Sequence, residues 1–283
     1  MNPKIYILLP VHNRKEITLK FINSLLKQSY TNYQLLLIDD GSTDGTSIEV
    51  KTLIPNTIII KGYGNWWWAG SLQQGFNWIK NNNINKKEIV LIVNDDTILE
   101  KDFLSNGTNY LKQNSNTLLL AYAYDLANNQ LLDCGINYDF KKNIISKPSG
   151  DKKINCLSTR GLFLYVEDFQ KIGGFYPNLL PHYGSDYEFT ARAFRKGYTL
   201  SSSNDVKLFF NKETTGIHVL NEKKFYNYFK LFFSKRNLMH PIYRINFYLL
   251  TFPFPYNLKY SFFHFINSLI SILIFFTNKK NLN

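Results

Sequence analysis

The sequence predicts an α/β fold in which a mainly parallel central sheet is flanked by helices and followed by a C-terminal helical extension. Strand-length apolar runs alternate with helix-length segments through the first half of the chain. The runs are continuous rather than alternating, which is typical of strands buried on both faces of a parallel sheet. The extension is predicted by a shift toward aromatic and basic residues beyond residue 220.

The predicted elements begin in βα order. Ile5–Leu9 is the first strand, and Glu16–Gln28 carries leucine and isoleucine at helical spacing. The rest of the first half is predicted to hold a strand at Leu35–Ile38, a short helix capped by Ser42, Thr43 or Asp44, a strand at Thr57–Ile60, a helix at Ser71–Asn81 and a strand at Ile89–Val93. The second half is predicted to hold strands at Thr117–Ala123, Leu131–Asn137 and Leu162–Val166, then a helix from about Asp186 to Lys196.

The positive charge is concentrated at the C-terminal end of the chain. The formal net charge is +12, and from Val219 onward nine Lys or Arg stand against one acid, Glu222, so eight of the twelve excess charges lie there. We therefore expect one domain at residues 1–219 and a basic, aromatic tail at residues 220–283 that has an acidic partner. Two cysteines without a CxxC motif, and no secretory signal, predict a cytoplasmic protein.

Acidic pairs end two of the predicted strands. Asp39-Asp40 ends the second strand and Asp95-Asp96 the fourth. Loops that leave the carboxyl ends of parallel strands share one edge of the sheet, where ligands bind. Carboxylates there can hold a hard cation that binds phosphates, and neither a GxxxxGK[ST] nor a GxGxxG loop is present. One acidic pair alone would indicate a capped turn, whereas two on one edge favour a site.

Four motifs in this order resemble family 2 glycosyltransferases of the GT-A fold. They are Leu-Pro-Val-His-Asn-Arg at 9–14, Ile-Asp-Asp-Gly-Ser-Thr-Asp at 38–44, Asn-Asp-Asp-Thr at 94–97, and Ser-Asp-Tyr-Glu-Phe at 185–189 with Arg192 and Gly197. The resemblance covers residues 4–218. It implies an inverting, metal-dependent hexosyl- or deoxyhexosyltransferase that uses a UDP- or dTDP-sugar. The acceptor would be a saccharide or lipid-linked saccharide in cell-surface polysaccharide synthesis.

The resemblance also assigns binding residues. It implies donor contacts from the loop after the first strand and from the acid that ends the second: Pro10, Val11, His12, Asn13 and Asp39. Asp95 and Asp96 resemble the family's DxD element, with Asp95 beside the donor and Asp96 holding Mg²⁺ or Mn²⁺. Asn94 departs from that element, which has an acid there. His218 stands where relatives carry a metal-binding histidine, although a lone histidine is equally a structural hydrogen-bond donor.

Asp186 matches the catalytic base of the family. It would take the proton from an acceptor hydroxyl as that oxygen attacks the anomeric carbon, which inverts the configuration. The alternative is an ordinary N-cap, since an aspartate often precedes an amphipathic helix. Glu188 and Arg192 have i, i+4 spacing, which predicts an ion pair on the helix.

Residues 64–70 carry three consecutive tryptophans, and these cannot all face a core. A loop on the ligand edge would offer indole faces to the CH faces of a sugar. The segment resembles donor-binding loops of bacterial rhamnosyltransferase-like members of the family, which implies donor contacts from Asn65 and Trp68. The alternative is that two of the three tryptophans pack under the sheet edge.

The tail contains one long apolar segment, Tyr260–Phe276. Its 17 residues are fewer than the ~20 that span a bilayer, and polar residues recur along one side at three- and four-residue steps. This pattern predicts a helix that lies in an anionic membrane surface, peripheral on the inner face of the plasma membrane. The alternative is a helical pair packed on the first domain or on a second copy of the chain. No recognition motif for nucleic acid is present.

Two other functions remain open on the sequence. A sugar nucleotidyltransferase shares the α/β plan but would usually have a glycine-rich, basic loop after the first strand, and residues 10–14 do not supply one. A catalytically silent scaffold protein that binds nucleotide sugars would share the pocket but would not need Asp186.

Overall fold

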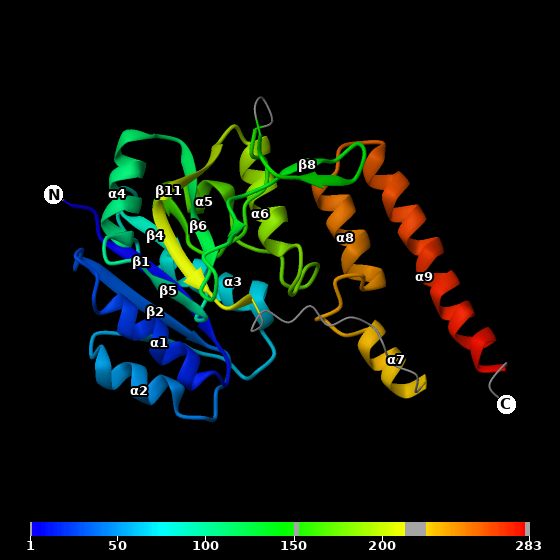
Figure 1. Cartoon of the computed structure of the whole chain (residues 1–283), viewed down its shortest axis with the longest axis horizontal. Helices are drawn as coiled ribbons and strands as arrows, with labels where there is room; N and C mark the ends of the chain where they lie inside the picture. Colours follow the sequence, from blue (N-terminus) through cyan, green and yellow to red (C-terminus); the bar gives the residue numbers. More distant parts are fainter. Residues whose placement is uncertain (1, 150–152, 213–224, 281–283) are drawn as a thin grey trace.

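The computed structural model describes residues 2–149, 153–212 and 225–280 (Figure 1). The strands are β1 (Ile5–Val11), β2 (Tyr33–Asp39), β3 (Ile58–Lys61), β4 (Ile89–Ile92), β5 (Thr97–Leu99), β6 (Thr117–Asp125), β7 (Leu131–Asp133), β8 (Asn137–Asp139), β9 (Ile144–Ser146), β10 (Leu162–Tyr165) and β11 (Thr199–Phe210). The helices are α1 (Lys15–Leu25), α2 (Thr46–Leu53), α3 (Trp67–Asn81), α4 (Phe103–Gln113), α5 (Val166–Ile172), α6 (Ser185–Arg195), α7 (Phe225–Phe232), α8 (Pro241–Thr251) and α9 (Tyr256–Lys280).

The central sheet is mixed and mostly parallel. Its strand order is β3-β2-β1-β4-β10-β6-β11-β5, with β7 paired to β6. Strands β1 to β4 are mutually parallel, whereas β10 runs antiparallel to both of its neighbours. This parallel half brings the carboxyl ends of β1, β2 and β4 to one edge, as the sequence predicts.

The continuous apolar runs arise because both faces of the sheet are covered. Ile7 and Leu9 of β1 pack into one core cluster with residues of α1, α2 and α4. Leu8, between them, packs into a second cluster with residues of α3, α5 and α6. All three side chains are fully buried, since successive residues of a strand point to opposite faces. The predicted fold class is confirmed.

Two of the predicted elements differ from the structure by more than three residues at one end. The predicted strand Leu131–Asn137 is broken at Asp133, whose Oδ1 accepts a hydrogen bond from the Gly135 amide at 3.0 Å. Gly135 has a φ of 84°, which ends β7 in a turn before β8 begins. The predicted helix Ser71–Asn81 begins four residues earlier, at Trp67. The prediction of a loop across residues 64–70 is therefore wrong from Trp67 onward.

The C-terminal helices pack on the sheet domain through α8. Phe247, Tyr248 and Phe252 form a core cluster with Ala191 of α6 and Tyr138 of β8. Helix α9 then packs along α8, on the side of the molecule away from the N-terminus (Figure 1). The predicted domain boundary near residue 220, and with it His218, lies outside the described residues.

Helix α9 has the polar side and the apolar side that the sequence predicts, but it is the polar side that packs against the protein. The polar residues Ser261, His264 and Ser268 are buried against the rest of the protein. The apolar side is exposed along most of its length, through Phe262, Phe263, Phe265, Leu269, Ile270, Leu273 and Ile274. Within the described ranges, no helix combines the length and the hydropathy needed to cross a membrane.

Candidate active site

A cavity of about 740 Å³ opens at the carboxyl edge of β1 and β4. It brings together several of the residues that the sequence predicts, namely Pro10, Val11, His12, Trp68, Asp95, Asp96 and Asp186. Three predicted donor-binding residues, Asn13, Asp39 and Asn65, are not among the residues that line it. The volume suits a ligand of a few hundred daltons.

An arginine lies between the two acids that follow β4. Arg14 contacts Asp95 Oδ1 through Nη1 at 2.9 Å and Asp96 Oδ2 through Nη2 at 3.4 Å. The Thr18 hydroxyl donates to Asp95 Oδ2 at 3.2 Å. Burial raises the pKa of Asp95 to about 6, although Arg14 lowers it. Arg14 ends the motif at 9–14, but it was not among the predicted site residues.

Asp96 retains an unsatisfied oxygen. Its Oδ1 is buried and has no hydrogen-bond partner among the described residues, which is costly for a carboxylate unless a ligand binds it. A hard cation such as Mg²⁺ or Mn²⁺ would satisfy it. Within the described part of the chain, no group of three or more His, Cys, Asp or Glu side chains could form a complete metal site. The residues present therefore fit a metal that is held largely by water and substrate oxygens.

Asp40 fixes the segment that enters α3. Its two carboxylate oxygens accept hydrogen bonds from the backbone N–H groups of residues 64 to 67, at 2.8 to 3.2 Å. Gly62 has no room for a side chain, because an added Cβ would lie 2.6 Å from Asp40 Oδ1. These contacts neutralise the N-terminal end of α3 with an internal carboxylate. The sequence places Asp40 at this edge as part of an acidic pair, but its role was not predictable, because the amides that it binds begin 24 residues further along the chain.

The three predicted donor-binding residues outside the lining hold neighbouring loops in place. Asp39 Oδ1 accepts from the Ser42 amide at 2.7 Å, and Oδ2 accepts from the Ser47 hydroxyl. Asn13 Oδ1 accepts from the Thr43 amide at 2.8 Å, which ties the loop after β1 to the loop after β2. Asn65 is exposed, and its amide is one of the donors to Asp40.

The three tryptophans divide between the core and the cavity. Trp66 and Trp68 pack against the core cluster beneath α3, as the packing alternative predicts. Trp67 and Trp68 both line the cavity, where the Trp68 indole N–H donates to the Thr159 hydroxyl at 3.2 Å. The Trp67 ring lies edge-on to His182, with 6.0 Å between ring centres. Two indoles are therefore available to a ligand.

Asp186 lies in the first turn of α6 and faces the cavity. The N-cap of α6 is Gly184 and no side chain caps it, so the N-cap alternative for Asp186 is not what the structure has. The Asp186 carboxylate opens onto the cavity but is closely surrounded by protein, and this burial raises its pKa to about 6. Nearby Asp133 also raises the pKa, whereas the Tyr187 amide and Arg160 lower it.

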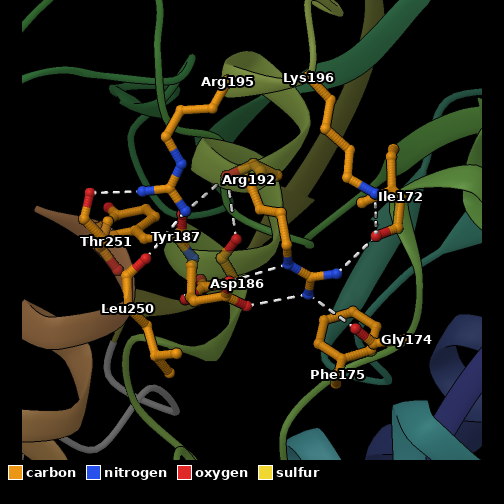
Figure 2. A network of polar contacts seen from close by, with 12 residues as sticks. Ile172, Gly174, Phe175, Asp186, Tyr187, Arg192, Arg195, Lys196, Leu250 and Thr251 are labelled. Atoms are coloured by element: carbon orange, nitrogen blue, oxygen red, sulfur yellow. Dashed lines mark hydrogen bonds and ion pairs between the residues drawn. The ribbon is translucent and has the colours of Figure 1, made fainter. Parts of the chain in front are cut away.

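Ion pairs and hydrogen bonds fix α6, and with it Asp186 (Figure 2). Arg192 Nε contacts Glu188 Oε1 at 2.9 Å, as the i, i+4 spacing predicts, but Glu188 is only 2% exposed, so this is a buried pair. Arg192 also donates to the carbonyls of Ile172 and Gly174, each at 2.7 Å. Arg195 donates to two carbonyls at the end of α8, at 2.7 and 2.9 Å.

Sequence reasoning missed several other residues around the cavity. His182 lines it beside Trp67, and burial, with a smaller contribution from Arg236, lowers the pKa of its imidazole to about 4. Its Nδ1 is buried and has no hydrogen-bond partner among the described residues. Arg160 lines the cavity near Asp186 and lies over the Phe210 ring at 3.8 Å. Arg236 reaches the cavity from the C-terminal tail.

Comparison with known proteins assigns the chain to a family. The family model of glycosyl transferase family 2 matches residues 6–160. The glycosyltransferase AglE of Haloferax volcanii is 25% identical over 214 residues, which are 72% of this chain and 66% of AglE. A GalNAc(5)-diNAcBac-PP-undecaprenol β-1,3-glucosyltransferase of Campylobacter jejuni is 29% identical over 116 residues, 40% of this chain and 35% of that protein. The chain thus spans less than two thirds of either relative.

A solved structure confirms the GT-A fold. GalNAc-T7, crystallised with UDP, GalNAc and Mn²⁺, aligns with a TM-score of 0.61 at 10% identity. The alignment covers 74% of this chain and 43% of the GalNAc-T7 chain. At that identity the likeness concerns the fold alone. The family model spans more than half of the chain and includes both acidic pairs of the cavity edge. The chain belongs to glycosyl transferase family 2.

Proposed function

We propose that this protein is an inverting glycosyltransferase that moves a sugar from a nucleotide-sugar donor to a saccharide acceptor. One observation carries the proposal: a single cavity holds both the acidic pair after β4 and a separate carboxylate, Asp186, on α6. The first group suits a diphosphate with its cation, and the second suits an acceptor hydroxyl. Inversion needs these functions on opposite sides of the reacting sugar.

Asp186 is the proposed general base. With a pKa of about 6 it is largely ionised at neutral pH, yet it is basic enough to accept a proton as the acceptor oxygen attacks. The buried Glu188–Arg192 pair fixes α6 and therefore the direction of the Asp186 carboxylate. This orientation lets a weak base act, since a held base needs no reorganisation at the moment of reaction.

Asp96 is the proposed metal ligand, through its unsatisfied Oδ1. A bound Mg²⁺ or Mn²⁺ would neutralise the charge that develops on the leaving diphosphate. Mn²⁺ in the GalNAc-T7 structure is consistent with divalent metal use in this fold. His218 is proposed as a further ligand. Arg14 would keep Asp95 and Asp96 oriented toward the cavity through its contacts with both carboxylates.

The nucleoside end of the donor is proposed to lie against the loop after β1. Pro10, Val11 and His12 line the cavity there, and Asn13 and Asp39 would act by holding that loop in place. Trp68 would stack against the sugar, with Asn65 at the rim. The resemblance of residues 64–70 to rhamnosyltransferase-like donor loops supports a dTDP-deoxyhexose as one of the donors to test.

The acceptor is proposed to be a lipid-linked saccharide in polysaccharide synthesis, reached at a membrane surface. The relative from Campylobacter jejuni is named for an undecaprenol-linked acceptor. On this protein, the exposed apolar side of α9 supports peripheral contact with an anionic membrane, since Lys and Arg outnumber acids in the tail by nine to one. A second copy of the chain covering the same side would give a homodimer instead.

The test begins with donor identification and ends with one variant. UDP-, GDP- and dTDP-sugars are first scored by thermal shift with Mn²⁺. Asp186→Asn should then abolish transfer and leave donor affinity within about threefold, because the amide keeps the shape but accepts no proton. Asp205→Asn, an exposed aspartate on β11, is the matched control and should transfer normally.

Three results would count against the proposal. Transfer by Asp186→Asn at the rate of the unmodified protein would show that Asp186 is not the general base. Release of pyrophosphate from a nucleoside triphosphate and a sugar phosphate would favour a nucleotidyltransferase, and donor binding without any turnover would favour a scaffold.

A further inference from the structure

We propose that Arg236, in the segment between α7 and α8, binds the diphosphate of the donor, so that the C-terminal helices complete the donor site. This inference rests on the proposed function and adds a residue to it from outside the region that the family model matches, which ends at residue 160.

The segment between α7 and α8 reaches the cavity beside Trp67. Arg236 lines the cavity, and its guanidinium carbon lies 5.5 Å from the centre of the Trp67 ring. Lys235, the preceding residue, lies at a similar 5.7 Å from the same ring but lines a smaller neighbouring hollow instead. The two cations thus share one aromatic contact and differ in which space they face.

Among the described residues, Arg236 lines the cavity without an ion pair to a carboxylate. Arg14 is paired with Asp95 and Asp96, whereas Arg160, which has no ion pair there either, lies over the Phe210 ring and near enough to Asp186 to lower its pKa. No ion pair or side-chain hydrogen bond of Arg236 is present in the described ranges. Within those ranges its five guanidinium N–H donors have no partner and can bind an anion, and a guanidinium binds phosphate oxygens in a bidentate geometry.

The charge balance of the cavity calls for such a cation. The acids that line it are Asp40, Asp95, Asp96, Asp133 and Asp186, whereas the arginines are Arg14, Arg160 and Arg236. A diphosphate would be repelled by this excess of negative charge. Without Arg236 the acids would outnumber the arginines by three, and Arg236 together with one divalent metal ion would offset that excess.

The segment that carries Arg236 is held in place by its own hydrogen bonds. The Asn237 side chain donates through Nδ2 to the Phe232 carbonyl at 2.8 Å, which closes the end of α7. His240 is buried, and its Nδ1 accepts from the amides of Ile242 and Tyr243, each at 3.2 Å, which starts α8. Helix α8 is attached to the sheet domain by Asn246, which donates to the Leu179 carbonyl at 3.0 Å. Arg236 is therefore presented from a fixed turn.

The experiment compares Arg236→Ala with Lys235→Ala in the full chain. UDP, GDP and dTDP are titrated with Mn²⁺ by calorimetry, and the tightest of the three is compared with its nucleoside monophosphate. Arg236→Ala should weaken the diphosphate about tenfold to a hundredfold, the range for a hydrogen-bonded charged group, and the monophosphate by less than about threefold. Lys235→Ala should change neither by more than about twofold, and Arg236→Lys should restore part of the loss.

Three outcomes would overturn the inference. Unchanged diphosphate affinity in Arg236→Ala, or an equal loss for diphosphate and monophosphate, would show that Arg236 is structural or idle. A loss seen only for geranyl diphosphate, tested as a lipid-diphosphate probe, would assign Arg236 to the acceptor. If the unmodified protein binds none of the three nucleotides, the proposed function fails as well, whereas normal nucleotide binding with an indifferent Arg236 removes this inference alone.

Discussion

Replacing Asp186 with asparagine should stabilise the fold at alkaline pH while it removes activity. The pKa of Asp186 is raised from 3.8 to about 6, mainly because burial disfavours its charged form. Each pKa unit corresponds to about 1.4 kcal/mol, so the full shift of about two units costs roughly 3 kcal/mol once the carboxylate is ionised. Because the carboxylate opens onto water in the cavity, we expect a gain of about 1 to 3 kcal/mol in Asp186→Asn.

The sign of this effect depends on pH. The unfolded chain loses the Asp186 proton near pH 4 and the folded chain near pH 6, so the folded state binds more protons between these values. Stability therefore falls as pH rises through this window and levels off above it. At pH 8 the whole cost is present, and at pH 5 about half of it. The asparagine variant removes the cost, and its carbonyl oxygen can still accept the hydrogen bond from the Tyr187 amide.

The assay is guanidinium unfolding of both proteins at pH 5 and pH 8. Taking the difference between variant and unmodified protein at each pH cancels the titration of every other group. The free energy of unfolding should rise in the variant, and by about twice as much at pH 8 as at pH 5. Asp205→Asn, which is exposed, should show no such dependence. A variant that is less stable at pH 8, or equally changed at both pH values, would refute the burial argument.

Four further results are expected. The kcat/KM for transfer should rise with pH through about 6 and then level off, because Asp186 must be ionised to act; a flat profile between pH 5 and 8 would exclude it as the base. Asp40→Ala should lower the free energy of unfolding by about 2 to 3 kcal/mol, since four backbone donors lose their acceptor, and a melt unchanged from that of Asp205→Ala would contradict this. Donor binding should weaken in EDTA and in Asp96→Ala, and indifference to both, measured by calorimetry, would remove the metal. Leu269→Glu should weaken sedimentation with anionic vesicles about tenfold or more without changing the molecular mass in solution, whereas Gln113→Glu should not; a shift from dimer to monomer would favour a homodimer.

The fold was predictable because burial on both faces leaves a direct mark on the sequence. Ile7, Leu8 and Leu9 are all apolar since both sides of β1 are covered, and the same holds for β2 and β4. The break after Asp133 was not predictable, because the turn depends on the hydrogen bond from the Gly135 amide to the Asp133 side chain. In the sequence alone, residues 131–137 look like one continuous strand. The start of α3 at Trp67 was missed for a related reason, since Asp40 supplies the acceptor for its first amides from a distant strand end.

The candidate site was only partly predictable. The acidic pairs were recognisable because they end buried strands. The sequence did not show which acid of the first pair lines the cavity and which holds its own turn. The carboxylates of Asp39 and Asp40 differ in their partners, as Asp39 bonds to its own turn and Asp40 to the entry of α3. Two adjacent aspartates look alike in the sequence, so these different partners could not be predicted from it. Arg236 was counted only as part of a basic tail, because its approach to Trp67 depends on how α8 docks on α6.

The carboxylate of Asp40 has a consequence for how the donor can be recognised. In many nucleotide-binding folds the free amides at a helix N-terminus hold the phosphates, and the glycine-rich turn that exposes them tolerates little change. Here that helix end is already occupied by an internal acid. Under the proposed function, the amides that start α3 would therefore not hold the phosphates, and side chains around the cavity would do so instead. Donor preference could then be redesigned at those positions while the buried turn, and the stability it provides, stays intact.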